Sequence, residues 1–129
     1  MKTVLLVVAI FFVQLISAQD VSQALVEDNK VYDNPEVKPE FPGGIRKFYE
    51  YVGKNFRIPE EGNGGKIIIQ FIVEKDGSLT RFKVVQDVGY GSGEEAIRVL
   101  KACSTKWKPG IQSGKPVRSV FVAPITVVK

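Results

Sequence analysis

Two stretches of the chain carry the apolar spacing of an amphipathic helix. The first follows Gly43-Gly44 and has apolar residues at intervals of three and four positions: Ile45, Phe48, Val52 and Phe56. Charged residues occupy the opposite side of the same stretch, as expected for a helix with one face against a core. Because Pro59 cannot continue a helix, we expect this helix to end near Asn55.

The second helical pattern starts at Ser92 and runs to about Ser104. Residues 92–95 (SGEE) fit a capping box, in which the serine hydroxyl accepts a helix N–H and Glu95 reaches back. The residues expected to face inward are Ala96, Ile97, Leu100 and Cys103. Trp107 stands in the turn that follows, and we expect its ring to close the core over the helix end.

Three further stretches favour β-strands. Residues 66–74 (KIIIQFIVE) are rich in β-branched and aromatic side chains and apolar on both faces, which predicts a central strand. The Asp-Gly pair at 76–77 predicts a tight turn, and residues 79–88 form the partner strand. Residues 116–123 form the last strand. Pro124 has no N–H, so it marks either an edge strand or the place where pairing stops.

The order helix, strand, strand, helix, strand predicts an α+β fold of one small domain, residues 41–129. The most economical arrangement is a three-stranded antiparallel sheet with two helices packed on one face. Each helix then buries its apolar side on the sheet and leaves its charged side in water.

The first eighteen residues match a secretory signal. Lys2 precedes an apolar run over residues 3–16, and small residues follow at 17–18. We expect cleavage after Ala18, which gives a periplasmic or secreted protein without a stable membrane span. The alternative is an uncleaved helix that anchors the chain in the inner membrane. The run is about six residues short of the roughly 20 that a span requires.

Residues 19–40 form an acidic lead-in. From Asp20 to Glu40 there are six acidic and two basic residues. Pro35, Pro39 and the lack of a clear period are typical of a flexible segment. Its valines are compatible with a short strand as the alternative. From residue 41 onward the net charge is +7, with basic residues interspersed among acidic ones. That pattern predicts an ordinary solvated surface and no nucleic-acid partner.

The composition argues against catalysis. The chain has no histidine and a single cysteine, Cys103. Histidine is the commonest general base and metal ligand, and one cysteine cannot build a disulfide within the chain or a zinc site. The acidic pairs at 60–61 and 94–95 are sequence neighbours, which do not face one another on a helix. We therefore expect no catalytic residue, no metal site and no cofactor.

Five short motifs occur together in one order along the chain. They are FPGG at 41–44, DGS at 76–78, EEAIRV at 94–99, WKPG at 107–110 and GKPV at 114–117. With these motifs, residues 39–126 resemble the C-terminal domain of TonB. The resemblance implies a periplasmic domain without enzymatic activity that engages TonB-dependent outer-membrane transporters.

In that family the last strand is an exposed edge, and a short transporter segment, the TonB box, adds beside it as a further strand. The residues that the resemblance assigns to partner binding are Val117, Arg118, Ser119, Val120, Phe121, Val122 and Ala123, together with Ile58 and Pro59. The family's transducers also carry a long Pro-rich spacer, which this sequence lacks, so we expect binding rather than transmission of force. The alternative is a self-associating or structural envelope domain, in which a second copy pairs at the same edge.

Overall fold

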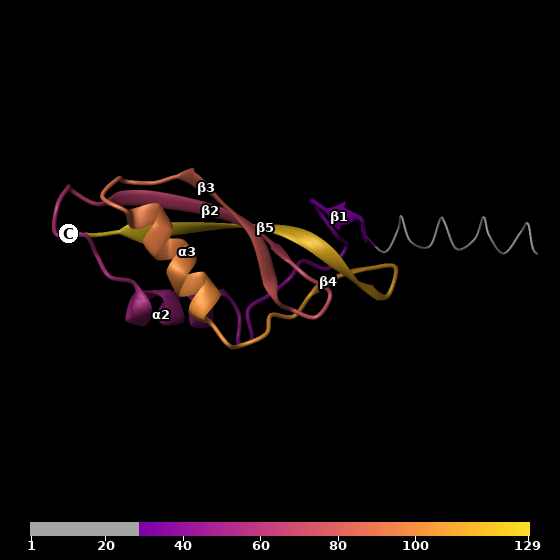
Figure 1. The fold of residues 1–129 in the computed structure, drawn as a ribbon. Coiled ribbons are helices and arrows are strands. Elements are labelled where there is room, and N and C mark those ends of the chain that lie inside the picture. Colours follow the sequence, from indigo (N-terminus) through magenta and orange to yellow (C-terminus); the bar gives the residue numbers. More distant parts are fainter. Residues whose placement is uncertain (1–28) are drawn as a thin grey trace, which may run out of the picture. The chain divides into compact units, whose positions relative to one another are not determined.

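Three long strands form the centre of the fold: β2 (Gly65–Val73), β3 (Leu79–Gln86) and β5 (Lys115–Val127). The computed structural model describes residues 29–129, of which 31–129 form one compact unit. Strand β2 lies between β3 and β5 and pairs antiparallel with both (Figure 1). The α+β fold and the three predicted antiparallel strands are confirmed, as is the central position of β2, but the sheet has five strands rather than three.

Two short strands extend this sheet. Strand β1 (Val31–Tyr32) runs parallel to β5, and β4 (Gly110–Gln112) pairs antiparallel with the start of β5. Strands of two and three residues are too short to show an alternating pattern, so the sequence did not predict them. Strand β1 lies in the acidic segment that was predicted to be a flexible lead-in with room for a short strand.

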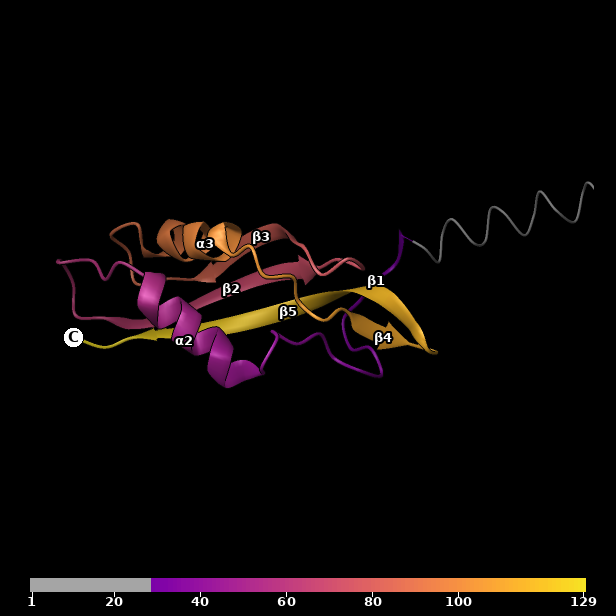
Figure 2. The same cartoon turned by 90° about the horizontal axis from the view of Figure 1, so that it is seen from below.

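Helices α2 (Ile45–Asn55) and α3 (Ser92–Ala102) pack on one face of the sheet (Figure 2). Both ends of α2 agree with the prediction, and Phe48 and Val52 are buried. Ile45 was predicted to face inward but is 53% exposed, because the buried face begins one turn later. Helix α3 ends two residues earlier than predicted, and its buried side includes Val99.

The predicted capping box of α3 is wrong. Gly91, in the left-handed conformation, holds the cap position, so Ser92 is already the first helical residue. The buried Ser92 hydroxyl accepts the N–H of Val88 at 3.1 Å. The Glu95 carboxylate accepts the N–H of Arg57 at 2.7 Å instead of reaching back to residue 92. The loop before α3 therefore provides the hydrogen bond of the Ser92 hydroxyl, and the Glu95 carboxylate binds the segment that contains Arg57.

An aromatic cluster forms the core between α2 and the sheet. Trp107 is 3% exposed, and its ring centroid lies 4.9 Å from Phe121, 5.2 Å from Phe48 and 5.5 Å from Phe71. The backbone N–H of Trp107 also donates to the backbone carbonyl of Gly77 at 2.9 Å. The prediction that Trp107 closes the core is confirmed.

The chain's N-terminal region bears on localisation. The predicted signal peptide, residues 1–18, lies outside the described residues, as do residues 19–28 of the lead-in. Between residues 29 and 129, no helix combines the length and the apolar character needed to cross a membrane.

Candidate functional site

The sheet has two outer edges: β3, which pairs only with β2, and the side of β5 that faces away from β2. On that side β1 pairs with Arg118 and Ser119. Over residues 120–127, no strand of the described chain pairs there. Unpaired N–H and C=O groups along such an edge are a template for an additional strand. The last strand is thus an edge strand, as the resemblance implied, although β1 covers part of it.

Pro124 identifies which backbone groups of β5 point outward. The strand continues through Pro124 to Val127, so the predicted end at residue 123 is wrong and the edge-strand alternative for Pro124 is correct. Proline has no N–H, and the Pro124 carbonyl accepts the Tyr49 hydroxyl at 2.8 Å. In an antiparallel pair a residue directs both of its backbone groups to the same side, and this direction alternates along the strand. The outward residues are therefore Arg118, Val120, Val122, Pro124 and Thr126.

Apolar side chains border this edge on both faces of the sheet. Val122 lies on the face without helices and is 50% exposed. On the helix side, Tyr49 and Ile45 lie one turn apart on α2, and Tyr49 reaches the strand through its hydroxyl. Partial burial raises the pKa of Tyr49, which keeps the hydroxyl protonated as a donor. An extended segment laid along β5 would meet apolar surface on both sides.

Arg118 does not point freely toward a partner. Its guanidinium binds Glu74 of the β2–β3 turn, with Nε 2.7 Å and Nη2 3.2 Å from the two carboxylate oxygens. Thr80 donates to the same carboxylate. These hydrogen bonds, led by that from Arg118, lower the pKa of Glu74 despite its partial burial. Arg118 therefore joins the start of β5 to the hairpin.

The predicted partner-binding residues do not form one surface. Val117, Ser119 and Ala123 are buried on the helix side of β5, and Phe121 packs against Trp107. The side chains of Val120 and Val122 lie on the face of the sheet without helices, and Val122 is the more exposed of the two.

Ile58, 52% exposed, and the half-buried Pro59 lie near the other end of the strand. There the Lys129 ammonium donates to the carbonyls of Glu60 and Glu61 at 2.6 and 3.0 Å. Residues 118 and 127 are about 30 Å apart at the usual strand rise. One short extended segment cannot cover both ends of β5.

The segment before Ile58 is fixed by α3. The Glu95 carboxylate accepts both the Arg57 N–H and the guanidinium of Arg98, while Arg98 donates to the carbonyl of Asn55 at 2.9 Å. The hydrogen bonds from Arg98 are the main reason why the pKa of Glu95 falls to about 2. Sequence reasoning assigned Glu95 to a cap and missed this role, which depends on how the helices pack.

Replacing Glu95 with glutamine is expected to lower the free energy of unfolding at pH 7 by about 1–2 kcal/mol. Hydrogen bonds to a charged group usually contribute about 1.5–3 kcal/mol, and the exposure of Arg98 reduces this. The folded pKa lies below the ordinary value of 4.5, so the stabilisation is present above about pH 4.5 and lost as the pH falls toward 2. Urea unfolding of Glu95→Gln and wild type from pH 7 to pH 2 would show the difference shrinking. Glu50→Gln, at a 47% exposed ion pair, is the control. Equal stabilities at pH 7 would contradict the role given to Glu95.

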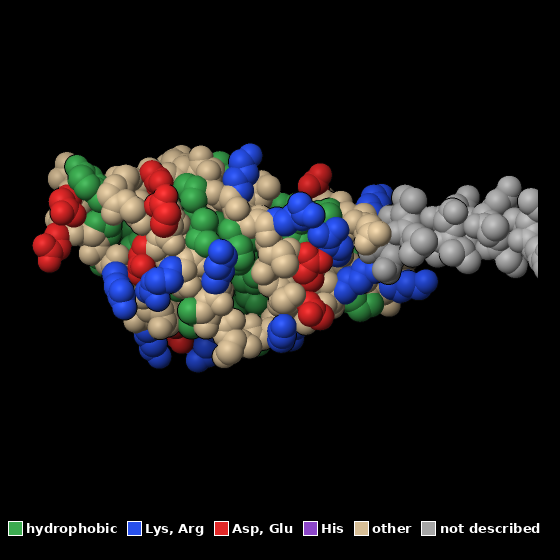
Figure 3. All heavy atoms as spheres, in the orientation of Figure 1, with side chains coloured by type: hydrophobic (Ala, Val, Ile, Leu, Met, Phe, Trp, Pro, Cys, Tyr) green, Lys and Arg blue, Asp and Glu red, His purple; other side chains and the backbone are tan. Residues whose placement is uncertain are grey.

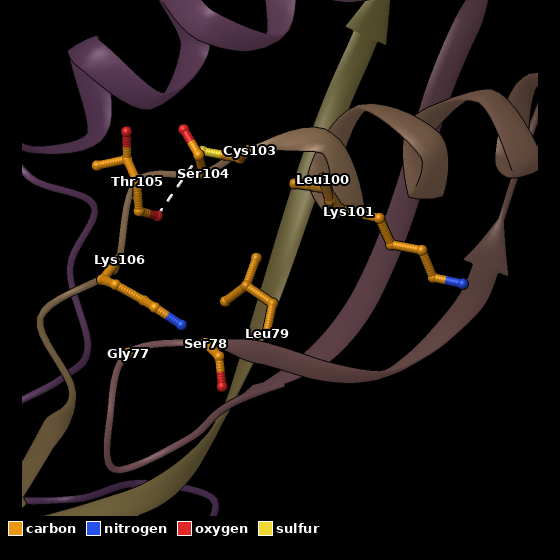
Figure 4. Close-up of a pocket in the computed structure, with 9 residues that line it drawn as sticks. All are labelled: Gly77, Ser78, Leu79, Leu100, Lys101, Cys103, Ser104, Thr105 and Lys106. Carbon is orange, nitrogen blue, oxygen red and sulfur yellow. Dashed lines mark hydrogen bonds between the residues drawn. The ribbon is translucent and has the colours of Figure 1, made fainter.

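A pocket of about 270 Å³ lies between the β2–β3 turn and the end of α3 (Figure 4). Leu79 and Leu100 line it together with Cys103, whose thiol donates to the carbonyl of Thr105 at 3.8 Å. Lys106 extends beside Leu79. Within residues 29–129 no group of three or more His, Cys, Asp or Glu side chains could hold a metal ion. The residues that line the pocket include no paired nucleophile and base, which nucleophilic catalysis requires.

The charged surface forms no single basic patch in the view of Figure 3. Lys and Arg side chains stand among Asp and Glu on this face, over the helices as well as over the strands. A nucleic-acid site would require positive charge gathered on one side. The strongest candidate site in the described chain is therefore the open edge of β5, where geometry and apolar surface coincide.

Comparison with known families agrees with this architecture. The family described as Gram-negative bacterial TonB protein C-terminal matches residues 58–126, more than half of the chain. The chain belongs to this TonB C-terminal family. The match includes β2, β3, α3, β4 and nearly all of β5, and it begins after β1 and α2. The resemblance read from the five motifs is thereby confirmed.

Two further comparisons complete the picture. The chain is similar to the NMR solution structure of the TonB C-terminal domain of Helicobacter pylori, at 20% sequence identity and a TM-score of 0.48. That alignment covers 64% of this chain and 90% of the other. No curated protein matches the chain.

Membership of the TonB C-terminal family gives the chain its general role. The family consists of periplasmic interaction domains without enzymatic activity, which act with outer-membrane transporters in TonB-dependent transport. For this chain, the role is protein interaction in the cell envelope.

Proposed function

We propose that the chain binds an extended segment of an outer-membrane transporter by strand addition at the open edge of β5, in the periplasm. The observation that carries this proposal is the outward direction of Val120 and Val122. The backbone N–H and C=O of Val122 meet no other strand of the described chain, whereas β1 reaches the N–H of Val120. In strand addition, main-chain hydrogen bonds supply affinity and alternate side chains supply selectivity.

The two faces of the edge define the partner segment. Along an added strand, one set of side chains would lie beside Val120 and Val122, and the other beside Tyr49 on α2. Both surroundings are apolar, so the segment should carry apolar residues at alternate positions and no charge between them. A charged side chain there would lose hydration without gaining an opposite charge.

Replacing Val122 with proline is the direct test of this proposal. The change removes one outward N–H and places a ring where the partner backbone would lie, while extended backbone before a proline is favourable. We expect the Kd for a synthetic peptide carrying the TonB box of a transporter from the same bacterium to rise about tenfold or more, measured by calorimetry.

The control is Val122→Thr, which keeps the N–H and the β-branched shape and should change the Kd by less than about threefold. Equal affinities of wild type and Val122→Pro, with both proteins folded, would contradict strand addition at this edge. The self-association alternative predicts a different result: a concentration-dependent dimer that Val122→Pro dissociates, and no peptide binding. Light scattering of the same samples distinguishes the two.

A further inference from the structure

The open edge of β5 is short because both of its ends are occupied. At one end Val31 and Tyr32 of β1 pair with Arg118 and Ser119. At the other, Pro124 offers no N–H, and its carbonyl already accepts the Tyr49 hydroxyl. Between these ends the Val120 carbonyl and both backbone groups of Val122 are open, while the Val120 N–H faces β1. Two residues are far fewer than the five or six of a typical strand.

Strand β1 is held in place by the segment that follows it. Val37 and Ile111 exchange two backbone hydrogen bonds of 3.0 and 2.9 Å, and Glu40 and Lys108 exchange two of 3.0 and 2.8 Å. Glu36 and Gln112 bind each other through backbone and side chain. These contacts fix residues 36–40 beside β4, and only three residues separate them from β1. A strand tethered so closely has a high effective concentration at the edge.

The backbone pairing of β1 with β5 is short by comparison. It involves two residues, both of them partly exposed. The anchor at 36–40 does not depend on that pairing, since its hydrogen bonds are made to β4 and to the turn before it. Strand β1 can therefore leave β5 while the anchor stays in place. It also precedes the residues that match the TonB C-terminal family.

We propose that β1 is a displaceable strand that covers the docking edge, and that a partner segment gains its full pairing length by replacing β1 at Arg118. This inference rests on the proposed function. With β1 displaced, the continuous outward run becomes Arg118, Val120 and Val122. The tethered β1 then sets a minimum length for a partner segment. To displace β1, the segment must form more backbone hydrogen bonds with β5 than the two residues of β1 do.

The test uses a double variant, Val31→Pro with Tyr32→Pro, made in the full chain. Proline at both positions removes the two N–H groups of β1, including the Tyr32 N–H that faces β5, while the anchor at 36–40 is unchanged. The Kd for the same TonB-box peptide is expected to fall about tenfold, since the peptide no longer has to break the β1 pairing. The control, Asp33→Ser with Asn34→Ser, alters the adjacent residues outside the strand and should leave the Kd unchanged.

A second measurement follows β1 directly. In the isotopically labelled wild type, addition of the peptide should shift the amide signals of Val31 and Tyr32 as the strand leaves β5. If wild type and double variant bind equally and these signals stay fixed, the displaceable strand is refuted while strand addition stands. If neither protein binds the peptide, strand addition fails, and the displaceable strand fails with it.

Discussion

Replacing Trp107 with alanine is expected to lower the free energy of unfolding by about 3–5 kcal/mol. Trp107 is 3% exposed and contacts four other aromatic rings in the core: Phe41, Phe48, Phe71 and Phe121. Its removal leaves a cavity between α2 and β5 that these side chains cannot fill by moving slightly. Urea unfolding monitored by circular dichroism would measure the loss.

The control for Trp107 is another large aromatic residue on the surface. Tyr90 is 63% exposed, so Tyr90→Ala should change the stability by less than about 0.5 kcal/mol. A loss below about 1 kcal/mol for Trp107→Ala would mean that the aromatic cluster does not hold α2 against the sheet. The aromatic cluster would then not be what holds Tyr49 of α2 beside β5.

Replacing Gly77 with alanine is expected to destabilise the protein by about 3 kcal/mol or more, for two separate reasons. Gly77 has a φ of +86°, which alanine adopts only with strain. A Cβ at this position would also stand 2.1 Å from the carbonyl oxygen of Trp107, which is backbone and cannot move aside alone. The clash would separate the β2–β3 turn from the segment that carries Trp107.

Gly114 provides a matched control. Its φ is +74°, but a Cβ there would meet no atom within 4 Å. Gly114→Ala therefore measures the conformational cost alone, about 1–2 kcal/mol. The loss for Gly77→Ala should exceed that for Gly114→Ala by at least about 1.5 kcal/mol. Equal losses, measured by urea unfolding, would show that the contact with Trp107 adds nothing.

The pattern of hydrophobic residues was sufficient to predict the helices and strands that bury one face. Helix α2 ends at Asn55 as predicted, and the Asp-Gly turn joins two strands as predicted. These features depend on residues that are near one another in the sequence. The burial of Trp107 could also be predicted, because a large aromatic residue next to a helix end has few other places to go.

Features that depend on distant contacts could not be predicted. Strand β1 exists because residues 36–40 are fixed beside β4, far along the chain. The extension of β5 through Pro124 is tolerated because the proline nitrogen faces away from β2, and this direction depends on the strand register. The capping box failed for a similar reason, since Glu95 found Arg57 instead.

The candidate site was predicted in part. The family resemblance directed attention to the last strand, and the structure shows an open edge there over residues 120–127. The sequence could not show that Arg118 binds Glu74 or that Tyr49 occupies the carbonyl of Pro124. Both contacts bring together residues separated by more than forty positions. Among the residues predicted to bind a partner, these contacts leave Val120 and Val122 as the ones that the proposal uses.

Mapping the amide signals of the labelled wild-type chain during titration with a TonB-box peptide tests the account most directly. Strand addition predicts the largest changes at Val120 and Val122, slowed hydrogen exchange of their amides, and contacts between the two backbones across the new pair. Changes centred on the pocket at Leu79 and Leu100, with residues 120–122 unaffected, would contradict a docking edge on β5.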